Sequence, residues 1–319
     1  MSSPSSEIFP IASRKSPLAL AQAKLVSQWL AQVSERPIKS SEKHFPVIGL
    51  ISSGDKNQIG SLADSGGKGL FTKEIEQALL NGEARYAVHS MKDMPAQNPP
   101  GLVIAAIPRR EDPRDAFICE NYSNLQNLPS GAILGTASVR RKAQIHNIRQ
   151  DLKTELLRGN VSTRLKKCAE GDIAATFLAV AGLNRLGLTK HITQIMSPDE
   201  MLPAVGQGAL CIQARQDDEE ALALAAKITC KETELCVTME RAFLATLDGS
   251  CKTAIAGLAT IDSDQLYFLG EYFIDGDGEP LKVTKSIDLP RSISHEEHII
   301  IAKAQGTIAA QDILAQMHG

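Results

Sequence analysis

The sequence predicts an α/β protein with a small α+β part at its C-terminal end. Short apolar runs alternate with segments of helical periodicity over the first two thirds of the 319 residues, a pattern typical of strands and helices packed in layers. The last third has one helical segment, three strand-like runs and a closing helix. The length favours about two domains and leaves room for a third, smaller one.

The first series of elements lies between residues 8 and 107. A strand at Ile8–Ala12 precedes a helix that begins at Pro17 with Ser16 as its N-cap, because Ser accepts a backbone N–H there and Pro suits the first turn. The remaining elements are strands at Pro46–Ser52, Ala84–Ser90 and Leu102–Ile107 and a helix at Phe71–Leu80 that ends near Gly82.

A second series follows the charged bend at Arg109–Asp115. Its helices begin near Ser138 and Ser162, and a third spans Leu178–Leu186 and ends at Gly187. Its strands are expected at Ala132–Gly135, Thr154–Leu157, Asp172–Thr176 and Gly208–Ala214.

The last third predicts a module with a small antiparallel sheet. A helix at Glu232–Leu247 comes first, and the turn Asp275-Gly-Asp-Gly marks a hairpin. The remaining elements are strands at Ala254–Thr260, Gln265–Ile274 and Pro280–Asp288 and a closing helix at Ser294–Met317.

The charge is divided unevenly along the chain. The formal net charge is −3, but residues 1–108 carry +2, residues 109–202 carry +4 and residues 203–319 carry −9. This total, with aromatic residues at only 4%, does not favour a nucleic-acid-binding protein. The positive charge of the first two thirds instead indicates a local site for a small anion.

Other classes of protein are also disfavoured. No apolar run approaches the roughly 18 residues of a membrane span, and no secretory signal is visible in the sequence, so we expect a cytoplasmic protein. The six cysteines form no C-x-x-C pair, which argues against a structural zinc. We expect most of them to be inert packing residues.

Basic residues recur where a strand gives way to a helix. The three places are Ser13–Ser16, Thr136–Arg141 and Leu157–Arg164. Helix N-termini attract anions, and arginine binds carboxylates or phosphates in a bidentate way. A single such arginine is more simply a solvated helix residue, but three strand ends of one α/β fold favour a ligand with several anionic groups.

Three further motifs each allow two interpretations. Gly66-Gly-Lys68-Gly lacks the spacing of a phosphate-binding Walker loop and suits a glycine hinge. Asp93, in the run His89-Ser-Met-Lys-Asp93, is either a catalytic carboxylate or a turn residue. Cys251 follows Gly249-Ser250 and is either an accessible reactive thiol or an incidental surface cysteine.

Short motifs follow one another in order along nearly the whole chain. They are Ala12-Ser-Arg-Lys-Ser-Pro-Leu-Ala-Leu, Gly66-Gly-Lys-Gly-Leu-Phe, Ala87-Val-His-Ser-Met-Lys-Asp-Met-Pro, Arg110-Glu-Asp-Pro-Arg-Asp-Ala-Phe, Gly135-Thr-Ala-Ser-Val-Arg-Arg, Leu157-Arg-Gly-Asn-Val-Ser-Thr-Arg, Leu178-Ala-Val-Ala-Gly-Leu-Asn-Arg-Leu-Gly, Leu202-Pro-Ala-Val-Gly-Gln-Gly-Ala and Gly249-Ser-Cys251. This ordered set resembles the porphobilinogen deaminase family.

The resemblance implies three domains. Two are α/β domains similar to periplasmic binding proteins, and the third is a small C-terminal α+β domain with an antiparallel sheet. We expect domain 1 at residues 1–108 with a return segment at 203–228, domain 2 at 109–202, and the C-terminal domain, which anchors the cofactor, at 229–319.

The resemblance also implies the activity. The family condenses four porphobilinogen molecules head to tail, with loss of ammonia, into the linear tetrapyrrole hydroxymethylbilane. It builds the product on a dipyrromethane cofactor bound by a thioether to a loop cysteine, here Cys251, and Asp93 is the implied catalytic carboxylate. We expect an enzyme of haem biosynthesis that is a monomer and has no nucleic-acid or membrane partners.

The remaining roles are carried over by position in the motifs. The implied cofactor-binding residues, besides Cys251, are Lys92, Thr136, Ser138, Arg140 and Arg141. The implied substrate-binding residues are Arg14, Ser16, Arg158, Arg164 and Arg185, and Lys68 and Phe71 belong to the implied active-site loop. No metal is implied.

The sequence departs from the family pattern after Cys251. The family often has Gly-Gly-Cys-Gln-Val-Pro, whereas this chain has Gly249-Ser-Cys-Lys-Thr-Ala254 and lacks the proline. Two other hypotheses explain part of the pattern. A two-lobed anion-binding module accounts for the arginines but not for the thiol, and a cysteine hydrolase needs a histidine partner that the sequence does not reveal.

Overall fold

A computed structural model describes residues 8–52, 72–247 and 253–318 of the chain. The chain forms two compact units. Unit 1 comprises residues 1–109 and 210–230, and unit 2 comprises residues 110–209 and 231–319. The three domain boundaries expected from the sequence remain a prediction.

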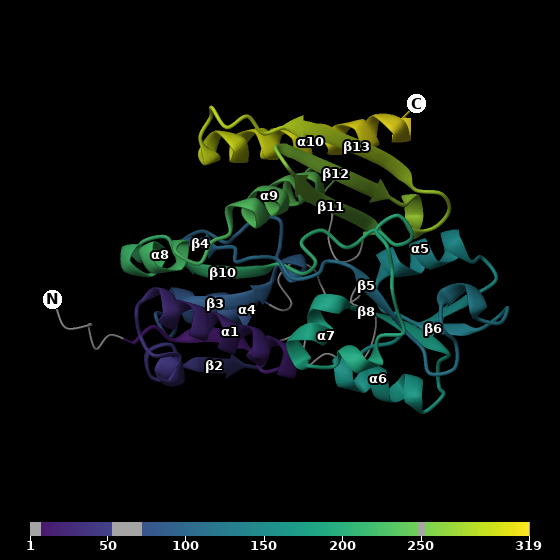
Figure 1. Ribbon diagram of the computed structural model, residues 1–319, viewed down its shortest axis with the longest axis horizontal. Coiled ribbons are helices and arrows are strands. Elements are labelled where there is room, and N and C mark those ends of the chain that lie inside the picture. Colours follow the sequence, from purple (N-terminus) through teal and green to yellow (C-terminus); the bar gives the residue numbers. More distant parts are fainter. Residues whose placement is uncertain (1–7, 53–71, 248–252, 319) are drawn as a thin grey trace. The chain divides into compact units, whose positions relative to one another are not determined.

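Unit 1 is built on a five-stranded mixed sheet in the order β2-β1-β3-β10-β4 (Figure 1). The parallel strands are β1 (Ile11–Arg14), β2 (Val47–Leu50) and β3 (Tyr86–Ser90), while β10 (Leu210–Arg215) lies antiparallel between β3 and β4 (Leu102–Ala106). The helices of the unit are α1 (Pro17–Val33), α2 (Ser41–His44), α4 (Lys73–Leu80) and α8 (Glu219–Ala226), with short 3-10 turns η1 (Ile38–Ser40) and η2 (Met91–Asp93).

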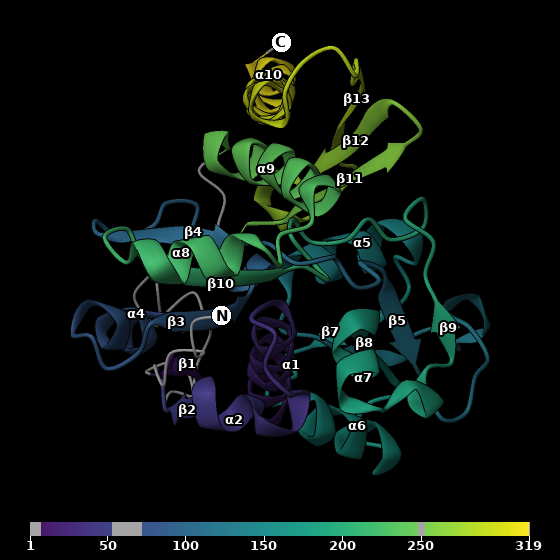
Figure 2. The same ribbon diagram turned by 60° about the vertical axis from the view of Figure 1, so that its left-hand side comes forward.

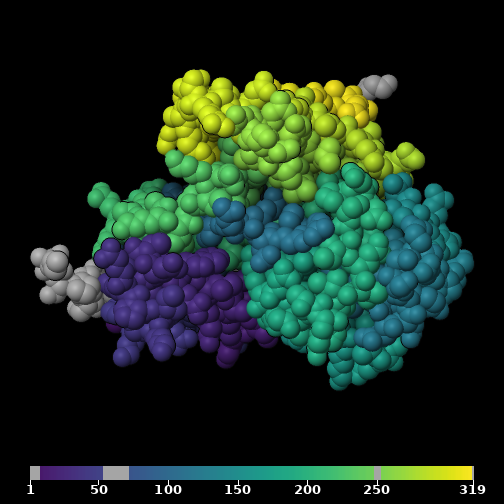
Figure 3. Space-filling view, in the orientation of Figure 1, coloured from purple at the N-terminus to yellow at the C-terminus, as the bar shows by residue number. Residues whose placement is uncertain are grey.

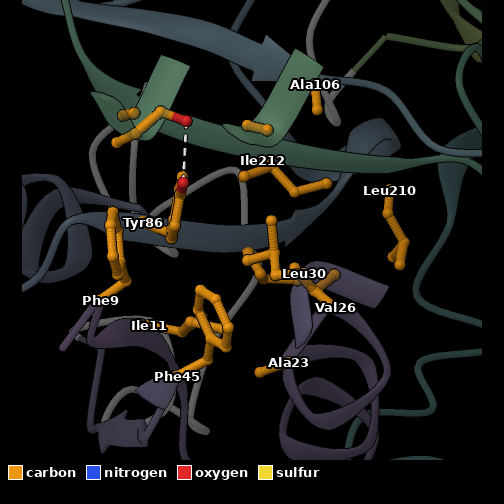
Figure 4. Close-up of a cluster of buried hydrophobic side chains, with 14 of the residues drawn as sticks. Phe9, Ile11, Ala23, Val26, Leu30, Phe45, Tyr86, Ala106, Leu210 and Ile212 are labelled. Atoms are coloured by element: carbon orange, nitrogen blue, oxygen red, sulfur yellow. Dashed lines mark hydrogen bonds between the residues drawn. The ribbon is translucent and has the colours of Figure 1, made fainter. Parts of the chain in front are cut away.

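The core of unit 1 lies between α1 and the sheet (Figure 4). Val26 and Leu30 of α1 are fully buried, and Phe9 stacks on Tyr86 with ring centroids 6.1 Å apart. The hydroxyl of Tyr86 donates a 2.8 Å hydrogen bond to the carbonyl of Ala221 at the start of α8, so the one polar group of this aromatic cluster is satisfied. The packed sheet therefore fixes the direction of the strands that lead into the candidate site.

Unit 2 contains a second five-stranded sheet, in the order β7-β6-β8-β5-β9. Its strands are β5 (Asp115–Ile118), β6 (Ile133–Gly135), β7 (Lys153–Glu155), β8 (Ala175–Ala179) and β9 (Gln194–Ile195). Strands β7, β6 and β8 are parallel, and β5 is antiparallel to β8. The helices are α5 (Val139–Ile148), α6 (Val161–Ala169) and α7 (Val180–Leu186), with η3 (Leu125–Asn127) and η4 (Thr189–His191).

The C-terminal module of unit 2, residues 231–318, has a three-stranded antiparallel sheet. Phe243 and Phe268 meet edge to face at 5.0 Å in its core. Its elements are α9 (Lys231–Thr246), β11 (Ile255–Asp262), β12 (Gln265–Tyr272), η5 (Ile274–Gly276), β13 (Leu281–Asp288) and α10 (His295–His318). Helix α10 packs on α9 (Figure 2), and its yellow atoms form the outer layer of the module in the space-filling view (Figure 3).

The buried carboxylate of Glu240 holds α9 to the rest of unit 2. It is fully buried and accepts hydrogen bonds from the backbone N–H groups of Gly206 (2.7 Å) and Ala259 (2.8 Å). It also forms an ion pair with Arg110, whose Nε donates to the carbonyl of Gln207 at 2.7 Å. The backbone N–H of Arg110 also donates to the hydroxyl of Thr233 at 3.0 Å. Residues 110, 207 and 233 each lie within a few residues of a position where the chain passes from one unit to the other, so these three segments of unit 2 are bonded to one another.

The predicted fold class is confirmed: strands and helices alternate through the first two thirds, and a small antiparallel sheet with two helices follows. Ser16 caps α1, as predicted, and α5 begins next to Ser138, which was expected near the start of this helix and is its N-cap. Residues 115–118 form a strand, β5, although Asp115 was expected to end a charged bend. Strand β8 begins three residues later than expected, because Ile173 and Ala174 come before its paired segment. Among the described residues, no helix is long and apolar enough to cross a membrane.

We predict that Gly306→Ala lowers stability, because α10 approaches α9 closely at this glycine. A Cβ atom there would lie 2.2 Å from the carbonyl oxygen of Met239 and 2.9 Å from Cβ of Ala242. Alanine adds about 1 kcal/mol of helix propensity, but overpacking against a backbone atom costs roughly 1–3 kcal/mol or more. Urea denaturation should therefore show a net loss of stability.

Ala304→Gly is the control for this prediction, since residue 304 is exposed in the same helix. It should cost only the propensity difference of about 1 kcal/mol. A gain of stability in Gly306→Ala would show that the two helices do not need a glycine at this position.

Candidate active site

Four of the predicted site residues lie at one edge of the unit 1 sheet. Strands β1 and β3 are parallel neighbours, so their carboxyl ends share that edge, where α/β proteins bind ligands. Arg14 is the last residue of β1 and Ser16 caps α1. Lys92 and Asp93 form η2 directly after β3. The topology therefore brings together the predicted catalytic carboxylate, one cofactor residue and two substrate residues.

The loop from β1 to α1 is held by two serine hydroxyls. The Ser16 hydroxyl accepts the backbone N–H of Ala19 at 3.3 Å, and the buried Ser13 hydroxyl donates to the carbonyl of Ala19 at 3.1 Å. The first turn of α1 carries no acidic residue. Its partial positive charge therefore remains available to an anion beside the half-buried Arg14.

The η2 turn is fastened by methionines on both sides of its charged pair. Met91 and Met94 are 1% and 4% exposed, whereas Lys92 and Asp93 are half-buried. The backbone N–H of Met94 donates to the carbonyl of Met91 at 3.1 Å and closes the turn. The Asp93 carboxylate thus sits on a closed turn whose apolar residues are in the core.

His89 precedes this turn and lies inside the sheet. It is 5% exposed, and burial lowers its pKa to about 4, while a hydrogen bond with Gln213 of β10 and the charge of Arg14 act as smaller influences. A histidine with this pKa is neutral at pH 7. His89 is therefore a buried residue of β3 that packs beneath the candidate site.

The second group of predicted residues lies at the corresponding edge of the unit 2 sheet. Strands β7, β6 and β8 are parallel, so each leads into its helix at the same edge. Thr136 follows β6, and its hydroxyl accepts the backbone N–H of Ser138 at 3.1 Å. Ser138 caps α5 and Asn160 caps α6. Two adjacent helix N-termini, each capped and each free of acidic residues in its first turn, therefore face this edge.

Arg158 and Arg164 flank the start of α6, and both are half-buried. Nε of Arg164 donates to the carbonyl of Gly159 at 2.9 Å, where the backbone φ of +118° requires glycine. Arg185 lies in the last turn of α7, and its Nη2 donates to the carbonyl of Gly208 at 2.7 Å. Burial lowers the pKa of Arg185, which the charge of Glu111 partly offsets.

Arg140 and Arg141 converge on one buried carboxylate, that of Asp115. Nη2 of Arg140 donates to Oδ2 at 2.7 Å, and Nη2 and Nε of Arg141 donate to Oδ1 at 2.6 and 3.2 Å. Gln207 adds its Nε2 at 3.0 Å. The two arginines are 4% and 5% exposed and Asp115 is fully buried.

The three side chains together carry one net positive charge, since two guanidinium groups share one carboxylate. The charge of Glu271 acts on Arg140 as a smaller opposing influence. Most of the remaining donors are used within unit 2: Nη1 of Arg140 donates to the carbonyl of Leu202 and Nη1 of Arg141 to that of Phe177, both at 2.7 Å. Nε of Arg140 is buried without a hydrogen-bond partner. Burial lowers the pKa of Arg140, opposed by the charge of Asp115.

Asp115 and Gln207 were not among the predicted site residues. A signal for Asp115 was present, because the charged bend is followed directly by the apolar run Ala116-Phe-Ile-Cys119, which is typical of a strand. Lys68, Phe71 and Cys251 lie outside the described residues. Among the described residues, no group of three His, Cys, Asp or Glu side chains could hold a metal ion.

Comparison with known families gives two matches. Residues 9–223 match the family model described as porphobilinogen deaminase, dipyromethane cofactor binding domain. Residues 234–296 match the model of the porphobilinogen deaminase C-terminal domain.

Curated relatives carry the same name. A porphobilinogen deaminase of Nitrobacter hamburgensis is 45% identical over 303 residues, which cover 95% of this chain and 92% of that protein. Those of Caulobacter vibrioides and Bacillus pumilus are each 48% identical, over 265 and 262 residues and 82% of both chains.

Solved structures of lower similarity were also found. The methionine-binding protein MetQ is 11% identical with a TM-score of 0.43, and the match covers 69% of this chain and 89% of that one. A lipoprotein of the YaeC family from Enterococcus faecalis V583 is 16% identical with a TM-score of 0.40, over 72% and 94%.

We predict that His89 makes stability depend on pH between 7 and 4. The unfolded chain binds a proton near the ordinary pKa of 6.5, and the folded chain binds it near 4. The contribution of neutral His89 is therefore present above pH 6.5 and lost as the pH falls toward 4, by about 3 kcal/mol. Urea denaturation over this range should show the loss in the native protein and a smaller loss in His89→Gln.

The same substitution at His44, in α2, is the control and should retain the native pH dependence. Parallel curves for the native protein and His89→Gln would contradict the prediction.

Proposed function

The chain belongs to the porphobilinogen deaminase family, and from this membership we propose which of its residues perform the family's reaction. The protein is a transferase of tetrapyrrole biosynthesis, which leads to porphyrins and haem. It condenses four porphobilinogen molecules head to tail, with loss of ammonia, into the linear hydroxymethylbilane. The observation that carries this function is the family match over residues 9–223 together with 45% identity over 95% of the chain.

The residues at the start of α5 fit a cofactor rich in carboxylates. The Arg140–Arg141–Asp115 cluster retains one positive charge, and the buried Nε of Arg140 has no hydrogen-bond partner. A buried donor without an acceptor is rare in native proteins and indicates an additional partner. When bound, dipyrromethane supplies a primer of two pyrrole rings with acetate and propionate side chains, from which the product chain is extended.

We assign the binding of the cofactor's carboxylates to Lys92, Thr136, Ser138, Arg140 and Arg141. The cofactor's covalent attachment would be a thioether to Cys251, which follows α9 in the sequence and precedes β11. Three observations support this assignment: the family match to a cofactor-binding domain, the capped N-terminus of α5 and the net positive charge of the Arg140–Arg141–Asp115 cluster.

Asp93 is the proposed catalytic carboxylate. Loss of ammonia from the aminomethyl carbon of porphobilinogen leaves positive charge delocalised over the pyrrole. A carboxylate that accepts a hydrogen bond from the pyrrole N–H stabilises this charge as it develops. The closed η2 turn, with Met91 and Met94 buried, keeps the carboxylate in place, so that little reorganisation is needed during the reaction.

The carboxylates of the incoming substrate require cations at defined positions. Arginine forks bind acetate and propionate groups bidentately, and helix N-termini add partial positive charge. We assign this role to Arg14, Ser16, Arg158, Arg164 and Arg185, and we place Lys68 and Phe71 in the active-site loop. The half-buried positions of Arg14, Arg158 and Arg164 support the assignment.

The location, oligomeric state, partner and domain division complete the proposal. We propose a cytoplasmic enzyme that works as a monomer, with porphobilinogen as its small-molecule partner. We also propose the three-domain division at residues 1–108 with 203–228, 109–202 and 229–319. The change of sheet type between the mixed sheets and β11-β12-β13 supports a separate C-terminal domain.

Intact-mass measurement of purified Cys251→Ala tests the anchor. The native protein should be heavier than its sequence by one dipyrromethane, and the variant should have the sequence mass alone, because the thioether cannot form. Cys230→Ala, at a half-buried cysteine, is the control and should keep the added mass. An added mass in Cys251→Ala would refute the anchor.

Turnover of Asp93→Ala tests the catalytic carboxylate. We expect kcat to fall by about 100-fold or more, since a positioned acid–base group typically contributes 10²–10⁴-fold, while intact mass still shows the attached dipyrromethane. Glu83→Ala, an exposed acidic residue before β3, should retain native turnover. Substantial turnover by a fully loaded Asp93→Ala protein would contradict the role.

A further inference from the structure

A buried glutamine of α1 bonds the residue that leads into the catalytic turn. Gln22 is 3% exposed, and its side-chain Nε2 donates to the hydroxyl of Ser90 at 3.0 Å. The same hydroxyl lies 3.3 Å from Oε1 of Gln22. Ser90 is the last residue of β3, three positions before Asp93, and is separated from Gln22 by 68 residues of sequence.

Packing alone does not explain a glutamine at this position. The buried face of α1 is mainly apolar, with Ala19, Ala23, Val26 and Leu30. Its other buried polar side chain, Ser27, donates to the backbone carbonyl of Phe45 at 2.9 Å, whereas Gln22 bonds a side chain of β3. Burial of an amide costs free energy that only a hydrogen bond recovers, and a methionine of similar volume would fill the space without that cost. The hydrogen bond between Gln22 and Ser90 therefore fixes the orientation of α1 relative to the end of β3.

The hydroxyl of Ser90 bonds Gln22 and does not cap the turn that follows it. Ser90 occupies the N-cap position of η2, where serine commonly accepts a backbone N–H, yet it forms no capping hydrogen bond. The methionines of the turn hold it against the core through contacts that have little directional preference. The hydrogen bond to Gln22 adds a directional contact with α1 at the end of β3, where Ser90 also pairs with Leu210 of β10.

We propose that Gln22 is a positioning residue for catalysis: through Ser90 it fixes the Met91–Asp93 turn, and with it the Asp93 carboxylate, relative to Arg14 and Ser16 at the start of α1. The inference rests on the proposed function, since it needs Asp93 as the catalytic carboxylate. A misplacement of about 1 Å at a catalytic group can cost on the order of 100-fold in rate. The pair thus links the N-terminal end of α1, where Arg14 and Ser16 would bind the substrate's carboxylates, to Asp93, which would stabilise the developing charge.

The test is a double-mutant cycle of Gln22→Met and Ser90→Ala, measured as steady-state kinetics on porphobilinogen. Each single variant should lower kcat by about tenfold or more and change KM less than twofold, because the bond acts on the position of Asp93 and not on ground-state binding. The double variant should be no slower than the slower single variant, since both changes remove one interaction. Ser90→Thr, which keeps the hydroxyl, should restore most of kcat.

Two controls separate positioning from folding. Gln28→Met makes the same substitution at an exposed position of α1 and should leave kcat and KM at native values. The loaded fraction of each variant, from intact mass, and its urea denaturation curve normalise kcat to folded holoenzyme. If Gln22→Met loses stability but its normalised kcat is native, the residue is structural and the proposal is overturned.

Asp93→Ala, assayed in parallel, separates this proposal from the one on which it rests. Native kcat in Gln22→Met beside a strongly impaired Asp93→Ala would overturn the positioning role and leave the catalytic assignment intact. Native kcat in Asp93→Ala would overturn both. Additive losses in the double variant would also contradict the proposal, because they would show that Gln22 and Ser90 act independently.

Discussion

The buried carboxylate of Asp115 is the constraint on which the proposed ligand-binding edge of unit 2 depends. It brings the first residue of β5, the first turn of α5 and the segment containing Gln207 to one point. Removal of one partner from a buried ion pair typically costs 3–5 kcal/mol, because the other charge stays buried without compensation. The start of α5, and with it the cap at Ser138, is therefore set by a charge that lies inside the protein.

Glu240 imposes the same kind of constraint on the C-terminal module. Its carboxylate accepts two backbone N–H groups and the guanidinium of Arg110, all within unit 2. The donors come from three segments around α9: the segment after residue 202, the middle of β11 and the bend at residue 110. Since α9 and β11 are the elements before and after Cys251 in the sequence, the buried charge fixes the two elements that flank the proposed anchor along the chain.

The sequence was sufficient where the signal is local. Ser16-Pro17 and Ser138 act within one turn, so their helices were predicted with correct starts. Asp115 was assigned to a bend because its partners, Arg140 and Arg141, lie 25 and 26 residues away and no local pattern shows them. Helical periodicity likewise predicts that α1 buries one face, but not that Gln22 within that face meets a serine 68 residues later. Motif order, which is independent of such contacts, is what predicted the family.

The arginines of the proposed site belong to two electrostatic classes. Arg140 and Arg141 are buried and their guanidinium groups are already bonded to the carboxylate of Asp115, so they would act on a ligand mainly through the net positive charge of the cluster. Arg14, Arg158 and Arg164 are half-buried near helix starts, where solvent screens their charges and would lower the cost of binding and releasing an anion. A permanently held primer suits the first class and a substrate that arrives four times suits the second. Two proposed residues do not follow this division: the cofactor residue Lys92 is half-buried, and the substrate residue Arg185 donates to the carbonyl of Gly208 within unit 2. The burial argument therefore supports the proposed roles of the other five arginines and not of the whole set.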